Sequence, residues 1–391
     1  MKTKQADIKY CGVNEELIKN ANPKLNLEEV KIHHFYLTER HEIYKKKEIL
    51  KLPQSEWTND EIFKKYRFTN IRRELDRESV WLIKNISENN EMSLNEKILW
   101  TILFRCFNKS STFKKLSFPQ SFDIMGFGDA EIDAFRERVE EEVEKDDKYV
   151  WFTGAFITGG LKGCWAYPGK LFHEATANKV EVKIGKINDD SFEKTMQFNE
   201  AKKFVKENSD YYLIGLETNI QTRMIHLIKW CRDNLVHEKV EKAKTQQEAF
   251  NELRNIPGIG NFLAYQIWVD LTYIPDYIFS ENEFVVSGPG CSKGIDTIFE
   301  DKDGMNYEEC IFWYRDNLKN LWEENGLRYY PNELFDHLPE YDRLYNVMML
   351  ENSFCEHSKN SRARHKTGRP RNNYKPRDAI KTKKQNLTES W

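Results

Sequence analysis

The chain has 391 residues, of which 31% are charged and 13% aromatic, and its net charge is −3. This length supports a substantial hydrophobic core, and this composition excludes a disordered or fibrous protein. No apolar run reaches the length of a membrane span and the first residues lack a signal-peptide core, so we expect a cytoplasmic protein with no membrane partner. The seven cysteines are widely spread and form no Cys-x-x-Cys pair, so we expect neither a disulfide framework nor a bound metal.

Charge is distributed unevenly along the chain. From His357 to the end, eleven Lys or Arg face two Asp or Glu, which gives this stretch +9 and the remainder −12. The sequence therefore predicts a lead-in over residues 1–50, a helical domain over 51–356 and a basic tail over 357–391. In the tail, Gly-Arg-Pro with Arg369 and Arg371 is typical of an arm that orders on DNA, although a basic end can also serve solubility alone.

The first candidate binding segment is Phe68–Arg77, which we predict to be helical. Asn70, Arg73 and Arg77 recur three to four residues apart, so a helix would align them on one face. Acidic neighbours allow a salt-bridged surface helix. The alternative, which we prefer, is a face that contacts DNA phosphates or an extruded base.

Further helices are predicted from capping boxes and apolar periodicity. A core helix over residues 93–108 begins at a Ser93/Glu96 capping box, and an acidic, solvated helix follows over 129–148. Apolar stripes predict helices over 190–240, Tyr307–Trp322 and Tyr341–Cys355.

An aromatic and glycine-rich stretch over residues 149–169 interrupts this helical pattern. Trp151, Phe152 and Phe156 could stack on an extruded base, and the glycines permit close backbone approach. Equally, the stretch could be a short β-hairpin that packs its aromatics on the helical core.

The most specific pattern is a helical hairpin over residues 245–271. A Thr245/Glu248 capping box begins the first helix, a Pro257-Gly-Ile-Gly260 turn follows, and a second helix runs from about Asn261 to Leu271. Glycines let the backbone turn sharply, and unpaired N–H groups at the start of the second helix favour an anion. We expect Pro257, Gly258, Gly260 and Asn261 to grip a DNA phosphate, although a glycine-rich turn can also be purely structural.

Four segments resemble, in order, the marker segments of one family. They are Tyr66-Arg-Phe-Thr-Asn-Ile-Arg-Arg-Glu-Leu-Asp-Arg77, Ala264-Tyr-Gln-Ile-Trp-Val-Asp-Leu271, Glu283-Phe-Val-Val-Ser-Gly-Pro-Gly290 and Leu350-Glu-Asn-Ser-Phe-Cys-Glu356. The family comprises α-glutamyl/putrescinyl thymine pyrophosphorylases and 5-hydroxymethyluracil DNA kinases, a helical offshoot of the helix-hairpin-helix DNA glycosylase superfamily, and the resemblance spans about residues 35–360. It implies a mainly α, glycosylase-like fold with a small β-hairpin insertion.

The resemblance also implies roles for individual residues. A catalytic carboxylate follows the hairpin in such glycosylases and opposes the positive charge on the sugar, and Asp270, Glu281 and Glu283 are the candidates. Because no lysine follows the hairpin glycines, a water-using, monofunctional enzyme is implied. We also expect Lys293 to contact DNA. The expected base pocket further includes Gly288, Gly290, Glu351 and Asn352.

We therefore expect a monomeric DNA glycosylase that needs no cofactor and acts on double-stranded DNA with modified bases. The resemblance to Brig-type antiphage members implies excision of glucosylated hydroxymethylcytosine from phage DNA, which leaves abasic sites. The alternative is a 5-hydroxymethyluracil DNA kinase or base-hypermodifying transferase of phage type, which would need ATP and Mg²⁺. A DNA-binding module without catalysis is a third possibility.

Overall fold

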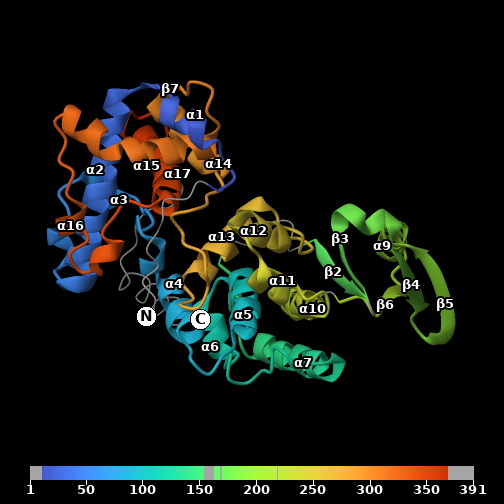
Figure 1. The fold of residues 1–391 in the computed structure, drawn as a ribbon. Helices are drawn as coiled ribbons and strands as arrows, with labels where there is room; N and C mark the ends of the chain where they lie inside the picture. Colours follow the sequence, from blue (N-terminus) through green and yellow to red (C-terminus); the bar gives the residue numbers. More distant parts are fainter. Residues whose placement is uncertain (1–10, 154–162, 168–169, 218, 369–391) are drawn as a thin grey trace. The chain divides into compact units, whose positions relative to one another are not determined.

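The computed structural model describes residues 11–153, 163–167, 170–217 and 219–368, which are mainly helical with small sheets (Figure 1). The expected mainly α class is confirmed. The described residues form two compact units. The middle of the sequence, Arg77–Phe279, is called the inner unit, and the two flanking stretches of the sequence, residues 11–76 and 280–368, together are called the outer unit. No helix in these ranges is both long and apolar enough to cross a membrane. The domain boundaries expected from composition stay a prediction.

The inner unit is built around helix α5 (Leu94–Phe107). The Ser93/Glu96 capping box that predicted this helix is present, and its residues from Lys97 to Phe107 are buried. Helices α10, α11 and α13 contact α5. The α-helices of this unit are α4 (Arg77–Leu82), α5, α6 (Ser110–Lys115), α7 (Asp129–Lys145), α9 (Phe198–Glu207), α10 (Ile220–Asp233), α11 (Val236–Lys242), α12 (Gln246–Arg254) and α13 (Asn261–Thr272), and a π-helical turn η4 (Ile83–Ser87) continues α4.

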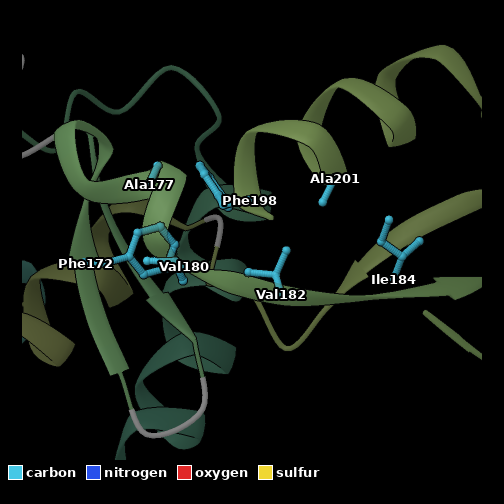
Figure 2. Close-up of a cluster of buried hydrophobic side chains, with 7 residues drawn as sticks. All are labelled: Phe172, Ala177, Val180, Val182, Ile184, Phe198 and Ala201. Carbon is cyan, nitrogen blue, oxygen red and sulfur yellow. The ribbon is translucent and has the colours of Figure 1, made fainter. Parts of the chain in front are cut away.

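A small α/β insertion lies between α7 and α10. Strands β2 (Cys164–Tyr167) and β3 (Lys170–His173) form an antiparallel hairpin, and the turn η5 (Glu174–Lys179) follows. Strands β4 (Glu181–Lys186), β5 (Asp189–Gln197) and β6 (Tyr211–Ile214) form a sheet in the order β5-β4-β6. Figure 2 shows the core of the insertion, where Val182, Ile184 and Phe198 pack together.

This insertion corrects the helix predicted over residues 190–240. Strands β5 and β6 occupy 189–197 and 211–214, and helix begins only at Phe198 and again at Ile220. On the central strand β4, Val182 and Ile184 are both buried while Glu181 and Lys183 are exposed, which is the two-residue period of a half-buried strand. Strands β5 and β6, which hold part of the apolar pattern that predicted helix, pair with β4 on either side.

The outer unit combines segments from both ends of the described chain. Helix α17 contacts α2, α14 and α15, and the short strands β1 and β7 pair antiparallel. Its helices are α1 (Glu15–Asn20), α2 (Leu27–Tyr44), α3 (Glu61–Lys65), α14 (Pro289–Ile298), α15 (Tyr307–Glu324), α16 (Pro331–Leu334) and α17 (Val347–Arg364). The other elements are β1 (Lys24–Leu25), β7 (Phe299–Asp301), and the short turns η1 (Lys45–Ile49), η2 (Gln54–Glu56), η3 (Arg73–Leu75) and η6 (Glu340–Asp342).

The helix predicted over Phe68–Arg77 is wrong for most of its length. Only Arg73–Leu75 form a short 3₁₀ turn, and Arg77 begins α4. The Asn70 side chain donates to the carbonyl of Leu75 (2.9 Å), and the Asn70 backbone N–H donates to the carboxylate of Asp76 (3.3 Å). These local bonds stabilise a turn in place of a helix.

Candidate functional site

Three of the four marker segments lie largely in the outer unit. They supply the turn before α4, the loop before α14 and the first turns of α17. The described contacts bring residues of these three segments together, although they are far apart in the sequence.

The centre of this site is the carboxyl group of Glu351. Glu351 lies on α17 with 6% of its surface exposed, and its Oε1 accepts a hydrogen bond from the backbone N–H of Gly288 at 3.4 Å. Burial raises the pKa of Glu351 to about 7, although the Gly288 hydrogen bond and the positive charge of Arg73 act to lower it. At neutral pH such a carboxyl group exists in both protonation states, so it can either accept or donate a hydrogen bond.

Asn352, the next residue, ties α17 to the turn that replaces the predicted helix. Its Nδ2 donates to the carbonyl of Asn70 at 2.8 Å, and the hydroxyl of Thr69 lies 3.5 Å from its Oδ1. The Asn70 side chain in turn accepts a hydrogen bond from Arg40. The structure thus joins Asn70 and Asn352, and the Asn352 side chain connects α17 to the turn that contains Asn70.

Two glycines of α14 are required by close packing. A Cβ on Gly290 would overlap the Sγ of Cys355, and one on Gly294 would overlap the backbone oxygen of Phe354. Helix α14 therefore packs against the backbone of α17, and Gly288 is its N-cap residue. Gly288 contacts Glu351 as described, whereas Gly290 packs against Cys355. Lys293 is exposed on the same helix.

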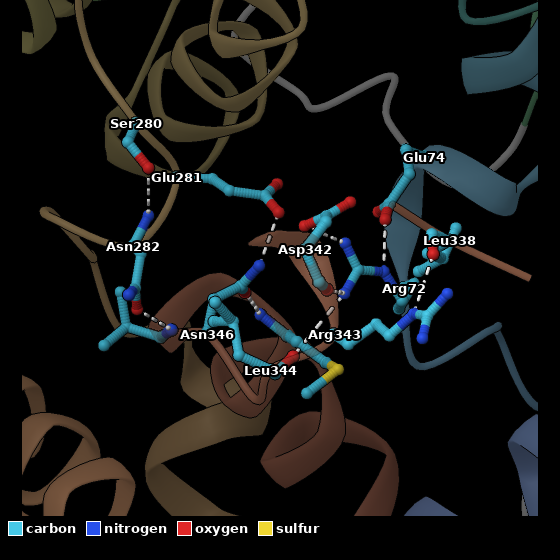
Figure 3. A network of polar contacts seen from close by, with 12 residues as sticks. Arg72, Glu74, Ser280, Glu281, Asn282, Leu338, Asp342, Arg343, Leu344 and Asn346 are labelled. Carbon is cyan, nitrogen blue, oxygen red and sulfur yellow. Dashed lines mark hydrogen bonds and ion pairs between the residues drawn. The ribbon is translucent and has the colours of Figure 1, made fainter. Parts of the chain in front are cut away.

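A second polar network lies around Arg72, as Figure 3 shows. The guanidinium of Arg72 is buried, pairs with the carboxylates of Glu74 and Asp342, and donates to the carbonyl of Asp342 at 2.9 Å. Each carboxylate is thus oriented by the arginine. Arg72 was not among the residues predicted from the sequence, although it stands inside a marker segment next to Arg73.

Glu281 belongs to the network around Arg72. Its Oε1 accepts a hydrogen bond from the side chain of Asn346, and its Oε2 is buried without a hydrogen-bond partner in the described chain. Burial, reinforced by the negative charges of Glu74 and Asp342, raises the pKa of Glu281 well above its ordinary value, and Arg72 opposes the rise.

Glu283, two residues further on, has a different environment. It is 7% exposed, its backbone carbonyl accepts from the N–H of Cys11 at 3.2 Å, and its carboxylate lies 3.5 Å from the N–H of Ser280. Asn282 lies between Glu281 and Glu283 in the sequence, and its Oδ1 accepts a hydrogen bond from the backbone N–H of Val347 at 3.1 Å. The loop is therefore fixed to the start of α17.

Several other predicted site residues lie in the inner unit. Asp270 is fully buried on α13 and pairs with the guanidinium of Arg105 on α5, which donates from Nη2 at 2.8 Å. Trp151 is 6% exposed, and the ring of Phe152 stacks on Phe107 at 4.9 Å. These aromatics pack against the core.

The predicted helical hairpin is present as α12 and α13. The Thr245/Glu248 capping box begins α12, Gly258 adopts a φ of +78°, and Gly260 is the N-cap of α13. A Cβ on Gly260 would meet nothing within 4 Å, and Asn261 is exposed. The turn thus leaves the start of α13 accessible, and its role in phosphate binding stays a prediction.

Four predicted site residues remain. Arg77 is exposed and pairs with Glu78 at 2.6 Å. Phe156, Arg369 and Arg371 lie outside the described residues.

No group of three or more His, Cys, Asp or Glu among the described side chains is placed to hold a metal ion. Glu74 and Asp342, two carboxylates of the outer unit, both pair with the Arg72 guanidinium.

Comparison with known proteins identifies the family. The family model described as "5-hmdU DNA kinase, helical domain" matches residues 29–369, so the chain belongs to this family. One relative is the "5-hmdU DNA kinase" of Bacillus phage SP10, which is 25% identical over 337 residues. That match covers 83% of this chain but 43% of the relative, so the chain spans less than half of the relative's length. No solved structure matches.

These findings confirm the family and overturn the main functional expectation. A protein named as a kinase transfers a phosphoryl group, so the expected glycosylase, with its hydrolase chemistry and abasic product, is wrong. The expectation of no cofactor is wrong for the same reason. Neither the Brig-type interpretation nor the glycosylase-like fold is confirmed.

Proposed function

We propose that this chain binds DNA that carries 5-hydroxymethyluracil and serves its phosphorylation, as the helical domain of a 5-hydroxymethyluracil DNA kinase. The observation that carries the proposal is the family match over residues 29–369. The convergence of three marker segments on Glu351 supports it, because that site belongs to the part of the chain that the family shares.

In this proposal the chain's part in the reaction is substrate recognition. Phosphoryl transfer needs a nucleoside triphosphate and Mg²⁺, held by a phosphate-binding loop and by carboxylates. The sequence contains no Gly-x-x-x-x-Gly-Lys-Ser/Thr, and the described part of the chain holds no group of three or more His, Cys, Asp or Glu placed to hold a metal. The relative has more than half of its length outside the match. We therefore assign ATP and Mg²⁺ to no residue described here.

Glu351 is the residue we assign to the modified base. A 5-hydroxymethyl group can both donate and accept a hydrogen bond, and uracil presents a ring N–H donor between two carbonyls. A buried carboxyl group that is present in both protonation states at neutral pH can pair with either feature. Burial excludes competing water, which increases the cost of leaving either group unpaired when the base lacks the hydroxyl.

Equilibrium binding tests the proposal. Fluorescence anisotropy would compare duplexes that carry 5-hydroxymethyluracil, thymine or cytosine at one position. We expect the hydroxymethyluracil duplex to bind most tightly, by about tenfold, which corresponds to one good hydrogen bond in a buried site. Equal binding of all three, or no binding, would overturn the proposal. Mass spectrometry after incubation with ATP and Mg²⁺ would show whether the chain alone adds a phosphoryl group.

A further inference from the structure

A surface hollow lies where α3 meets the end of α17, away from Glu351. Its volume is roughly 530 Å³, and residues from both helices line it. Ile62 and Ala363 contribute apolar surface, Tyr66 contributes an aromatic ring, and Lys65 and Lys366 contribute positive charge.

The positive charge of this hollow is not neutralised locally. Glu61 also lines it, but the carboxylate of Glu61 already pairs with Lys64 at 2.8 Å. Lys65 lies over the ring of Tyr66 at 5.3 Å, and neither Lys65 nor Lys366 forms an ion pair within the described ranges. The two lysines therefore leave a net positive potential over an aromatic surface.

The walls of the hollow are fixed in place. Arg364, near the end of α17, pairs with Asp60 at 3.0 Å, and Asp60 caps the first turn of α3. The guanidinium of Arg364 also lies 4.9 Å from the ring of Phe35 on α2. A ligand that enters this hollow meets a preformed surface, so little ordering cost opposes its binding.

The hollow and Glu351 share one helix, α17. Glu351 precedes Ala363 by twelve residues, so the two positions lie about 18 Å apart along α17. That distance is roughly half a turn of duplex DNA.

We propose that this hollow binds the phosphate backbone of a DNA strand. The proposal rests on the function proposed above, that the chain binds DNA, and adds a contact independent of the base. Lys65 and Lys366 would neutralise phosphates, and Tyr66 would pack against the adjacent sugar or base. The sequence after Gly368 is basic, with seven Lys or Arg against two Asp or Glu.

The test uses a double substitution, Lys65→Gln with Lys366→Gln, in the full chain. The matched control is Lys31→Gln with Lys319→Gln, which removes the same charge from two exposed lysines on α2 and α15 of the same unit. Anisotropy would be measured on 5-hydroxymethyluracil and thymine duplexes over a series of salt concentrations. Thermal unfolding would verify that both variants fold.

We expect the Lys65/Lys366 variant to bind both duplexes at least tenfold more weakly, with the preference between them unchanged. The slope of log affinity against log salt concentration should fall in magnitude by about 1.8, since each lost phosphate contact removes about 0.9. The control should retain the wild-type slope. A free nucleotide is the other source of phosphate, so ATP would be added as a competitor.

Three results would count against this inference. A wild-type slope in the Lys65/Lys366 variant would overturn it and leave the proposed function standing. Loss of ATP binding with DNA binding intact would assign the hollow to a free nucleotide. Absence of DNA binding by the wild-type chain would overturn the proposed function, and this inference with it.

Discussion

The carboxylate of Asp270 is held by the guanidinium of Arg105 in a fully buried ion pair. Arg105 donates to both carboxylate oxygens and also bonds Ser79 at 3.0 Å and Asn108. Helices α5 and α13 are joined by this pair at the centre of the inner unit. Its geometry is that of a structural pair, and the base-excision role was expected for Asp270 only as part of the glycosylase function that the comparisons contradict.

The first prediction concerns that pair. Asp270→Asn should destabilise the chain by about 3–5 kcal/mol, because it leaves the buried charge of Arg105 without its counter-charge. Urea unfolding followed by circular dichroism measures the loss. Asp233→Asn is the control: Asp233 pairs with Lys229 on the surface of α10, so its loss should change stability by about 0.5 kcal/mol or less. An Asp270→Asn chain as stable as wild type would contradict the structural role.

The second prediction concerns Arg72 in the outer unit. Arg72→Met should lower the free energy of unfolding by about 3 kcal/mol, because Glu74 and Asp342 lose their shared counter-charge while partly buried. Arg67→Met removes an exposed guanidinium five residues earlier and should be nearly neutral. If both variants unfold at the same urea concentration, the Arg72 network does not stabilise this unit.

The third prediction is a pH dependence. Glu351 has a folded pKa of about 7 against an ordinary value of 4.5, so its contribution to stability is present below pH 4.5 and is lost as pH rises through 7. The full loss is at most about 3 kcal/mol. Glu351→Gln removes this contribution, so its stability should fall less than that of wild type between pH 5 and pH 8.

Urea midpoints at both pH values measure this difference. Glu340→Gln, an exposed residue of the same unit, serves as control and should reproduce the wild-type profile. Coincident profiles for wild type and Glu351→Gln would show that the Glu351 carboxyl titrates normally.

The fourth prediction compares two glycines. Gly294→Ala should destabilise the chain by about 1–3 kcal/mol, because the added methyl group overlaps the backbone of Phe354 and forces α14 away from α17. Gly260→Ala adds the same group at an open position with φ of −92°, so the fold should tolerate it. Thermal unfolding distinguishes the two. Equal melting temperatures would mean that α14 and α17 are not packed as closely as described.

Much of the helical part could be predicted from the sequence because its signals are local. The capping boxes at Ser93/Glu96 and Thr245/Glu248 begin helices as expected, and Gly258 turns the hairpin with a positive φ. The strands β5 and β6 were missed because apolar spacing in short segments fits either period, and pairing with β4 decides the outcome.

The site could be predicted only as a set of segments. The marker segments include Glu351 and Gly288, which are hydrogen-bonded, and Arg73, whose positive charge acts on Glu351. No local pattern indicates that Asn70 would stabilise a turn rather than align on a helix. Arg72, Asp342 and Asn346 form their network through tertiary contacts between distant segments. Of these, Asn346 alone carried a local signal, as the N-cap of α17.

The central claim is that this chain recognises 5-hydroxymethyluracil in DNA through Glu351. The most direct test measures, at pH 7, the affinity ratio of hydroxymethyluracil to thymine duplexes for wild type and Glu351→Gln. We predict a wild-type ratio of about ten that falls to about two or less in the variant, with affinity for the thymine duplex largely retained. A ratio of one for the wild-type chain, or an unchanged ratio in the variant, would contradict the account.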